Sequence, residues 1–460
     1  MEVVMGCNSS GKERLFKTLR HEPVCKAVWV PFAGVHAGKL KGFSAREVLT
    51  DTDKLVESLL EVQRLYDPDG MPVVFDLQIE AEILGCSLLW SEDTPPSVAT
   101  HPLATLKTLP THLPEPNEGR LPLVLEAMRH VKAEIGDKTA LYGLVTGPFT
   151  LASHLRGTDI FYDTADDPAY LQSLIDYCVQ VANRMCELYI QAGVDVIAIV
   201  DPVTSQISPR VFSRYLERGF TDIFEHIRQL GAYSAFFVCG DASKNIEKMC
   251  QTKPDCIAVD ENVDIAFARQ ITQAHNITLQ GNIPLTTCML LGNQQDNAKF
   301  ALDLLDLVGD EGNFIVSPGC DMPYDTPPDN VIATLQALRD PHTARLILAN
   351  YHAADLDLDA VQVPDYAHLE RPLMEVFTLD SASCAACGYM LSAAQRAADS
   401  LQGQVDMLEF KITKPENVAR MHKMGIKNLP CILINGEVKF SSLIPSQKEL
   451  VAAIKSAGNP

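Results

Sequence analysis

The chain has 460 residues, of which 47% are hydrophobic and 21% are charged, so it can bury a large core and is not disordered as a whole. Its 59 acidic and 38 basic residues give a formal net charge of −21, which argues against nucleic acid or an anionic membrane as a partner. No apolar stretch approaches the ~20 residues that span a bilayer, and the N-terminus lacks the basic start of a signal peptide. We therefore expect a cytoplasmic protein.

Short β-rich apolar runs alternate with amphipathic helical stretches from the N-terminus to about residue 340. Helical periodicity is clear at Ala169–Ile190 and Arg210–Leu230. The expected strands are Ala27–Phe32, Pro72–Phe75, Leu141–Val145, Val194–Val200, Tyr233–Val238, Cys256–Val259, Asn276–Leu279 and Phe314–Ser317. Repeated alternation of strand and helix predicts a (β/α)8 barrel of the TIM type over residues 1–340, with a doubly wound sheet as the alternative.

Residues 341–372 are rich in proline and acidic residues and show weak periodicity, which predicts a connector with one helix at Ala344–His352. The composition changes after this segment. Residues 373–460 carry a net charge of +1, which leaves −22 for the rest of the chain. This asymmetry indicates that residues 373–460 form a separate domain.

The C-terminal domain has a clear order of elements. Strands are expected at Met374–Leu379, Val405–Ile412, Cys431–Ile434 and Glu437–Phe440, and helices at Gly388–Leu401, Lys414–Met424 and Gln447–Ala457. Thr413 with Glu416, and Ser446 with Glu449, have the spacing of capping boxes. Asn435-Gly436 between two apolar runs predicts a tight hairpin.

Two cysteines of this domain, Cys384 and Cys387, form a Cys-x-x-Cys motif between the first strand and the first helix. A cysteine at a helix N-terminus has a lowered pKa and forms a reactive thiolate. With Pro430, expected as a cis proline before the hairpin, these residues resemble the small thioredoxin- and glutaredoxin-like proteins. Cys431 follows Pro430 and is expected either in the strand core or as a third thiol that binds a metal together with the pair.

Polar side chains follow each expected barrel strand, at the end where the chemistry of such barrels lies. These positions include His36, Asp76, Asp201, Cys239, Glu261 and Cys320. Asp201 and Asp76 are candidate acid–base groups or caps of the following helix or turn, and His36 is a candidate ligand or proton carrier. Eight other cysteines are expected as small buried side chains: Cys7, Cys25, Cys86, Cys178, Cys186, Cys250, Cys256 and Cys288.

Residues 10–340 resemble the uroporphyrinogen decarboxylase superfamily, in its branch of cobalamin-dependent methyltransferases. The matching stretches are Phe75-Asp76 with Glu80-Ala81-Glu82, Thr146-Gly147-Pro148-Phe149-Thr150, Leu279-Gln280-Gly281-Asn282 and Ser317-Pro318-Gly319-Cys320. The loop after the first strand, Val30 to His36, lacks the arginines with which the decarboxylases hold their substrate. Uroporphyrinogen decarboxylation is therefore disfavoured.

The resemblance also implies a zinc site. Cys239 and Cys320 stand at the two cysteine positions with which the family's thiol methyltransferases bind zinc, while Phe237 occupies the position of their histidine. A third ligand would have to come from His36, Asp201, Glu261 or another residue at the same end of the barrel. Zinc bound by thiolates would lower the pKa of an incoming thiol.

The resemblance implies an enzyme that moves a methyl group between a corrinoid, free or on a partner protein, and a small acceptor such as a zinc-activated thiol. A folate acceptor without zinc is one alternative. Another is a redox-regulated sensor that binds a corrinoid or tetrapyrrole without turnover. We also predict that Cys384 acts on the chemistry of the barrel, with an independent, merely fused reductase as the rival hypothesis.

Overall fold

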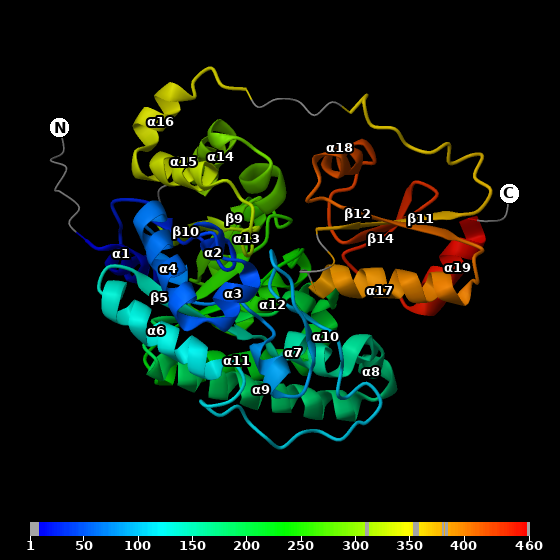
Figure 1. Cartoon of the computed structure of the whole chain (residues 1–460), viewed down its shortest axis with the longest axis horizontal. Helices are drawn as coiled ribbons and strands as arrows, with labels where there is room; N and C mark the ends of the chain where they lie inside the picture. The colour runs from blue at the N-terminus through cyan, green and yellow to red at the C-terminus, as the bar shows by residue number, and fades with distance from the viewer. Residues whose placement is uncertain (1–8, 309–311, 353–357, 380, 382–384, 458–460) are drawn as a thin grey trace. The chain divides into compact units, whose positions relative to one another are not determined.

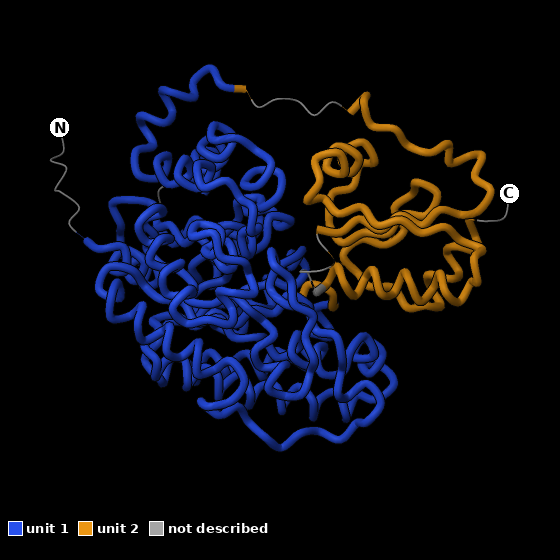
Figure 2. The backbone as a smooth tube through the Cα atoms, in the orientation of Figure 1, with its two compact units in different colours: residues 1–204, 208–351 blue, residues 205–207, 352–460 orange. Residues whose placement is uncertain are grey.

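The computed structural model describes residues 9–308, 312–352, 358–379, 381 and 385–457. Two compact units divide the chain, one made of residues 1–204 and 208–351 and the other of residues 205–207 and 352–460 (Figure 2). The end of the barrel unit thus lies beyond the predicted boundary at residue 340. The predicted helix of the connector starts earlier than expected, as α16 (Pro341–Ile347), and it packs on the last barrel helices.

Within the described part of the first unit, eight parallel strands form one sheet in the order β1-β10-β9-β8-β7-β6-β5-β2. Their bounds are β1 (Val28–Trp29), β2 (Gly70–Pro72), β5 (Ala140–Thr146), β6 (Val196–Val200), β7 (Tyr233–Val238), β8 (Cys256–Val259), β9 (Thr278–Ile283) and β10 (Phe314–Pro318). The outermost strands meet where Asp69 N donates to Trp29 O at 2.9 Å, which closes the predicted TIM-type barrel.

Helices surround these strands (Figure 1). They are α1 (Gly11–Leu19), α2 (His36–Lys39), α3 (Ala45–Thr50), α4 (Thr52–Tyr66), α5 (Ile79–Ile83), α6 (Leu121–Ile135), α7 (Pro148–Arg156), α8 (Ile160–Asp166), α9 (Pro168–Gln191), α10 (Pro209–Tyr215), α11 (Glu217–Gln229), α12 (Ile246–Gln251), α13 (Ile265–Ala274), α14 (Gln294–Val308) and α15 (Pro328–Arg339). The helix expected at Arg210–Leu230 is two helices, because the chain breaks at Leu216. Strands β3 (Leu88–Leu89) and β4 (Ser97–Val98) form a small separate ladder.

Asp69 holds the two ends of the barrel together. Its carboxylate is fully buried and accepts hydrogen bonds from Trp29 N at 2.7 Å, Arg14 Nε at 2.9 Å and Arg339 Nη1 at 3.2 Å. These partners come from α1, from β1 and from the end of α15. One buried carboxylate paired with two guanidinium groups therefore fixes the start and the end of the barrel sequence at the closure point.

The barrel interior is filled by aromatic and β-branched side chains. Phe237 of β7 is fully buried, stacks on Phe32 with ring centroids 4.8 Å apart, and meets Phe75 edge-on at 6.0 Å. Cys239 and Cys320 are only partly buried and pack against the top of this cluster. Phe237 thus forms the floor beneath the two cysteines.

The second unit has the predicted thioredoxin-like order. Strands β11 (Leu373–Thr378), β12 (Asp406–Lys411), β13 (Cys431–Ile434) and β14 (Glu437–Ser441) pair in the order β12-β11-β13-β14, and the helices are α17 (Ala385–Ser400), α18 (Pro415–Lys423) and α19 (Gln447–Ala457). The Ser446–Glu449 capping box forms, with Glu449 N donating to Ser446 Oγ at 3.2 Å. The predicted Thr413 box does not form, because α18 starts after Lys414.

Part of the predicted connector belongs to this second unit. Glu375, buried in the middle of the sheet, pairs with Arg420 of α18 at 2.5 Å and accepts a hydrogen bond from Tyr366 Oη at 2.8 Å. Lys423 donates to the Val361 carbonyl at 2.7 Å. Residues 358–372 therefore pack on the C-terminal domain instead of forming a free linker.

None of the helices in the described ranges combines the length and the apolar character needed to cross a lipid bilayer.

Candidate functional site

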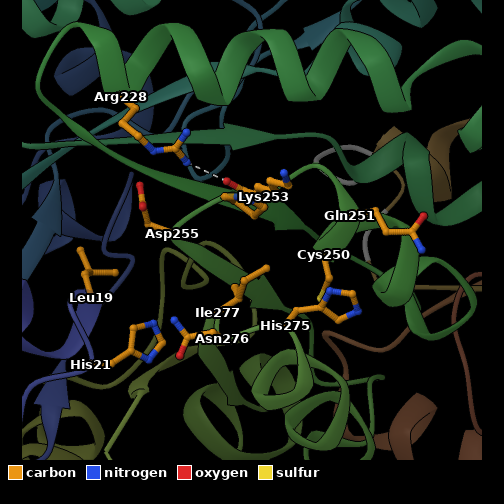
Figure 3. A pocket seen from close by; sticks show the side chains of 11 residues that line it. Leu19, His21, Arg228, Cys250, Gln251, Lys253, Asp255, His275, Asn276 and Ile277 are labelled. Carbon is orange, nitrogen blue, oxygen red and sulfur yellow. Dashed lines mark hydrogen bonds between the residues drawn. The ribbon is translucent and has the colours of Figure 1, made fainter.

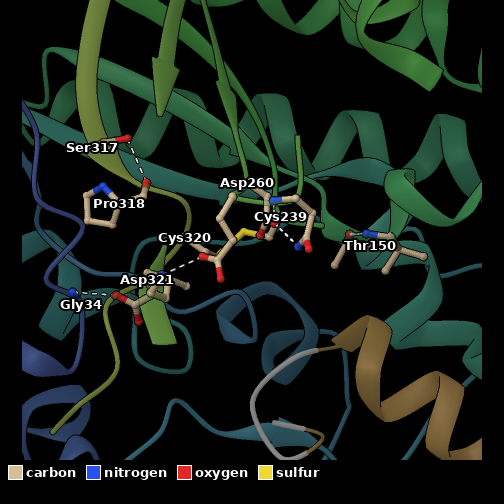
Figure 4. The surroundings of a disulfide bond; sticks show 12 residues. Gly34, Thr150, Cys239, Asp260, Ser317, Pro318, Cys320 and Asp321 are labelled. Atoms are coloured by element: carbon tan, nitrogen blue, oxygen red, sulfur yellow. Dashed lines mark hydrogen bonds between the residues drawn. A yellow bond between two sulfur atoms is a disulfide. The ribbon is translucent and has the colours of Figure 1, made fainter. Parts of the chain in front are cut away.

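The carboxyl ends of the parallel strands meet at one end of the barrel, which we call the mouth. Cys239 follows β7 and Cys320 follows β10, so these cysteines are 81 residues apart in sequence. Their Cα atoms are 5.9 Å apart and their sulfur atoms are joined in a disulfide (Figure 4). The structure therefore brings together the two residues that the sequence predicted as zinc ligands.

Asp201, which follows β6, is hydrogen-bonded to α7, the helix that follows the neighbouring strand β5. Its carboxylate accepts hydrogen bonds from Phe149 N at 2.8 Å, Thr150 N at 3.1 Å and Thr150 Oγ1 at 2.6 Å, at the first turn of α7. A side chain added at Gly147 would collide with Asp201, so glycine permits this close approach. Burial raises the pKa of Asp201 to about 6. This geometry is that of the helix-capping alternative.

His36 lies inside the protein at the start of α2 and is fully buried. Its Nδ1 is 3.0 Å from the Tyr324 carbonyl and its Nε2 is 2.7 Å from Tyr66 Oη. Burial lowers the pKa of His36 to about 4, so the ring is neutral at pH 7. Both ring nitrogens have partners within the barrel, which leaves neither of them directed at a substrate.

Asp76 and the nearby Glu82 both pair with Arg120, a residue that was not among the predicted site residues. Arg120, which precedes α6, pairs with Asp76 through Nη1 at 2.5 Å and with Glu82 through Nε at 2.8 Å. Its guanidinium also lies over the Trp90 ring, 5.0 Å from the centroid. No local pattern marks Arg120, because its partners are 38 and 44 residues away.

Glu261, predicted at the mouth and as a possible third zinc ligand, has a strongly raised pKa. One carboxylate oxygen accepts a hydrogen bond from Leu285 N at 2.8 Å, and the side chain lies against Gly319, the residue before Cys320. Burial and the neighbouring Asp260 raise the pKa of Glu261 to about 8. Glu261 is therefore a mouth carboxyl that can exchange a proton near neutral pH.

The other acids of the mouth are held by main-chain donors. Asp260 accepts a hydrogen bond from Asn262 N at 2.9 Å, and Asp321 accepts one from Gly34 N at 2.8 Å. Glu80 accepts hydrogen bonds from Thr146 N at 2.9 Å and Thr146 Oγ1 at 2.8 Å. The bonds of Asp321 and Glu80 connect segments that are far apart in the sequence, and the bond of Asp260 shapes its own loop.

The predictions for the remaining cysteines of the barrel are confirmed only in part. Six of the expected small core cysteines are buried as predicted: Cys86, Cys178, Cys186, Cys250, Cys256 and Cys288. Cys25 is exposed and disulfide-bonded, so that prediction was wrong, and Cys7 lies outside the described residues. The segment before β1 is irregular and lies on the surface, where a thiol is accessible to oxidation.

In the C-terminal domain, Cys387 is buried in the first turn of α17, while Cys384 lies outside the described residues. Cys431 is fully buried in β13, opposite Phe377, and burial raises the pKa of its thiol to about 12. The Leu429–Pro430 peptide bond is cis. Cys431 thus has the environment of a strand core residue.

A cavity of about 550 Å³ lies away from the mouth (Figure 3). Most of its lining residues, among them His21, Arg228, Lys253 and His275, precede barrel strands. In barrels of this type the chemistry lies at the carboxyl ends of the strands, so we place the candidate site at the mouth.

Comparison with known proteins places these features in a family. Residues 10–341 match the family model of uroporphyrinogen decarboxylase (URO-D). The chain belongs to the uroporphyrinogen decarboxylase family. Residues 374–455 of this family member match the thioredoxin domain model, in agreement with the predicted second domain.

Relatives within the uroporphyrinogen decarboxylase family include methyltransferases and decarboxylases. Methylcobamide:CoM methyltransferase MtbA of Methanosarcina acetivorans is 27% identical over 70% of this chain and 95% of its own length. MtaA of Methanosarcina barkeri, with the same activity in its name, is 26% identical over 72% of this chain and 98% of its own. Uroporphyrinogen decarboxylase of Nostoc punctiforme is 25% identical over 61% and 80%.

A solved structure agrees with the fold of this family. A methyltransferase from Methanosarcina mazei superposes with a TM-score of 0.66 and 24% identity, covering 73% of this chain and all of that chain. This likeness supports the barrel architecture.

Proposed function

We propose that the barrel transfers a methyl group between a corrinoid substrate and a small acceptor thiol. The observation that carries the proposal is the match to almost the full length of two relatives named methylcobamide:CoM methyltransferases. The two partly buried cysteines at the mouth, where barrel enzymes bind their substrates, support the same location for the reaction.

The loop after β1 favours methyl transfer over decarboxylation of a porphyrinogen. Val30, Phe32, Ala33 and Val35 are buried, and none of them can pair with a substrate carboxylate. Arg120, a cation near the mouth, already pairs with Asp76 and Glu82. A substrate with many carboxylates would need unpaired cations at this place.

The donors at the mouth do not fit a zinc site with three protein ligands. Cys239 and Cys320 supply two sulfur atoms, and Phe237, which the family resemblance puts at the position of the third ligand, is a hydrocarbon ring stacked on Phe32. Among the residues that the structure describes, no three His, Cys, Asp or Glu side chains gather around a common point. Catalytic zinc sites use three protein ligands, so we derive no step through zinc.

Glu261 is our candidate for the proton transfer that the reaction requires. When a thiol takes a methyl group, its sulfur forms the new S–C bond and its proton must leave. The Co–C bond breaks and its electron pair stays on cobalt. A carboxylate with a pKa of about 8 accepts a proton effectively near neutral pH, and Glu261 lies against the loop that carries Cys320.

The test is an anaerobic assay with methylcobalamin and a panel of thiols that includes coenzyme M. The expected result is a thiol-dependent change of the cobalamin spectrum together with a methyl thioether detected by mass spectrometry. A tetrahydrofolate arm tests the alternative acceptor. Methylcobalamin that binds and stays unchanged with every acceptor would contradict the proposal and favour a non-catalytic sensor.

Glu261→Gln tests the proposed proton acceptor. We expect the rate to fall by roughly a hundredfold and to lose its rise as the pH passes about 8. Glu225→Gln, on the exposed face of α11, is the matched control and should behave like the wild type. An unchanged rate and pH profile in Glu261→Gln would remove Glu261 from the mechanism.

A further inference from the structure

The pair Cys239 and Cys320 has the chemistry of a dithiol instead of a metal centre. Phe237 and Cys239 are two residues apart at the end of β7 and both contact the barrel interior, so Phe237 occupies the space directly below Cys239. Its ring is fully buried and stacked on Phe32. A hydrocarbon ring at this place supplies no ligand to a metal held by the two sulfur atoms.

Carboxylates at the mouth already accept hydrogen bonds from other groups of the protein. The Asp260 carboxylate accepts from Asn262, the Glu261 carboxylate from Leu285 N, and the Asp321 carboxylate from Gly34 N. Each of these bonds connects two loops or shapes one, so turning a carboxylate toward the sulfur atoms would leave a main-chain donor without its acceptor. Among the described residues that directly follow the barrel strands, Cys239 and Cys320 are therefore left as the two soft donors.

The backbone brings the two sulfur atoms together without a metal. The 5.9 Å between the Cα atoms lies within the range that a disulfide requires. Gly319 allows this approach, because a Cβ at that position would lie 2.7 Å from Glu261 N. Gly240, which follows Cys239, has a φ of 94°, a conformation that favours glycine.

Solvent access distinguishes this pair from the reduced cysteines of the barrel. Cys239 and Cys320 are half-buried, whereas Cys86, Cys178 and the other barrel thiols are buried. A disulfide is reduced by direct attack of a thiolate on sulfur, so exposure of the bond is a requirement for exchange. Cys239 and Cys320, each partly exposed at the mouth, are better placed for such exchange than the buried thiols.

We infer that the Cys239–Cys320 disulfide is a redox site that is reduced to a dithiol, with a protein dithiol as its reductant. A thiolate of the reductant attacks one sulfur atom of the pair and forms a mixed disulfide, which releases the other as a thiolate. The second thiol of the reductant then attacks the reductant's own sulfur in the mixed disulfide and releases the bound barrel cysteine as a thiol. Two electrons and two protons pass to Cys239 and Cys320, and the reductant leaves as a disulfide.

Two sources can supply the dithiol. One is the thioredoxin-like domain of the same chain, whose Cys387 lies at the start of α17, and the other is a separate protein of the thioredoxin class. A domain on the same chain acts at an effective concentration of about a millimolar, so weak binding suffices. The inference does not depend on methyl transfer and can stand if that proposal fails.

The first experiment measures the redox state and the metal content of the full chain. Under air, we expect digestion to yield one peptide pair linked through Cys239 and Cys320, and reduction should add two alkyl labels at these positions. Reduced protein loaded with zinc and then gel-filtered should keep far less than one zinc per chain. Zinc retained at one per chain by the wild type and lost in Cys239→Ser and Cys320→Ser would overturn the inference.

The second experiment compares reductants. Thioredoxin with its reductase and NADPH should reduce the Cys239–Cys320 bond faster than an equal concentration of the monothiol glutathione, with Cys178→Ala as the buried-thiol control. If Cys387→Ser slows this reduction, the dithiol of the chain relays the electrons, and if it does not, the external protein reduces the bond directly. Equal rates with thioredoxin and glutathione would show that no protein dithiol is selected and would sink the inference.

Discussion

Asp201 accepts two hydrogen bonds from Thr150, one from the backbone N and one from Oγ1, at the first turn of α7. The same carboxylate accepts a third bond from Phe149 N. Three donors directed at one buried carboxylate hold it in place and attach the end of β6 to α7, the helix that follows the neighbouring strand β5.

This arrangement predicts that Asp201→Ala destabilises the barrel by about 3 kcal/mol, because three buried donors lose their acceptor. Thr150→Val, which removes one of them, should cost about 1 kcal/mol. Urea denaturation gives both values. A folded, equally stable Asp201→Ala protein without methyl transfer activity would show instead that Asp201 has a catalytic role.

Phe237→His is expected to create the third zinc ligand that the mouth lacks. The reduced variant should retain about one zinc per chain after gel filtration, since two cysteines and one histidine form a common catalytic zinc site. The loss of the stack on Phe32 should cost about 2 kcal/mol of stability. Phe237→Leu is the control, and a histidine variant with as little zinc as this control would contradict the prediction.

The buried His36 should make stability depend on pH. Its pKa is about 4 in the folded protein and near 6.5 in the unfolded chain, so only the unfolded state takes up a proton between these values. Its contribution to stability is therefore present above pH 6.5 and is lost as the pH falls toward 4, by up to roughly 3 kcal/mol.

The measurement compares the urea midpoints of the wild type and of His36→Gln at pH 7, 6 and 5. The variant should lose less stability on acidification than the wild type. Exposed His342→Gln serves as the control and should follow the wild type. Parallel curves for the wild type and His36→Gln would refute the assignment.

Tyr366→Phe should destabilise the C-terminal domain by about 1 to 2 kcal/mol, because buried Glu375 loses one of its two donors. Tyr351→Phe is a matched change in the barrel unit, where the Tyr351 hydroxyl donates to Asp296 at 2.8 Å near the surface. It should have a much smaller effect. Differential scanning calorimetry of the two full-length variants tests this ranking, and equal shifts would contradict it.

Much of the fold could be predicted from local patterns. The bounds of β7, β8, β13 and α19 match the prediction to the residue, because each is a clear apolar run or amphipathic stretch between polar residues. The break at Leu216 and the absence of the Thr413 cap were missed, because tertiary packing decides where a helix bends or starts.

The candidate site was predictable only in part. The resemblance to the family predicted that Cys239 and Cys320 lie close together. The order of the strands agreed, because both residues follow strands that end at the mouth. The bonds of Arg120 to Asp76, of Tyr66 to His36 and of Thr150 to Asp201 could not be predicted in this way, because each joins residues at least 30 positions apart. Partners that distant are set by closure of the barrel and leave no local pattern.

The buried carboxylate of Asp69 has a consequence for synthesis of the chain on the ribosome. Arg14 and Trp29 are made before Asp69, but Arg339, the other cation on this carboxylate, is made 270 residues later. In a nascent barrel, the negative charge of Asp69 is therefore paired with Arg14 alone until the last barrel helix, which carries Arg339, has emerged. Because the C-terminal domain follows Arg339, the barrel can close while that domain is still being translated.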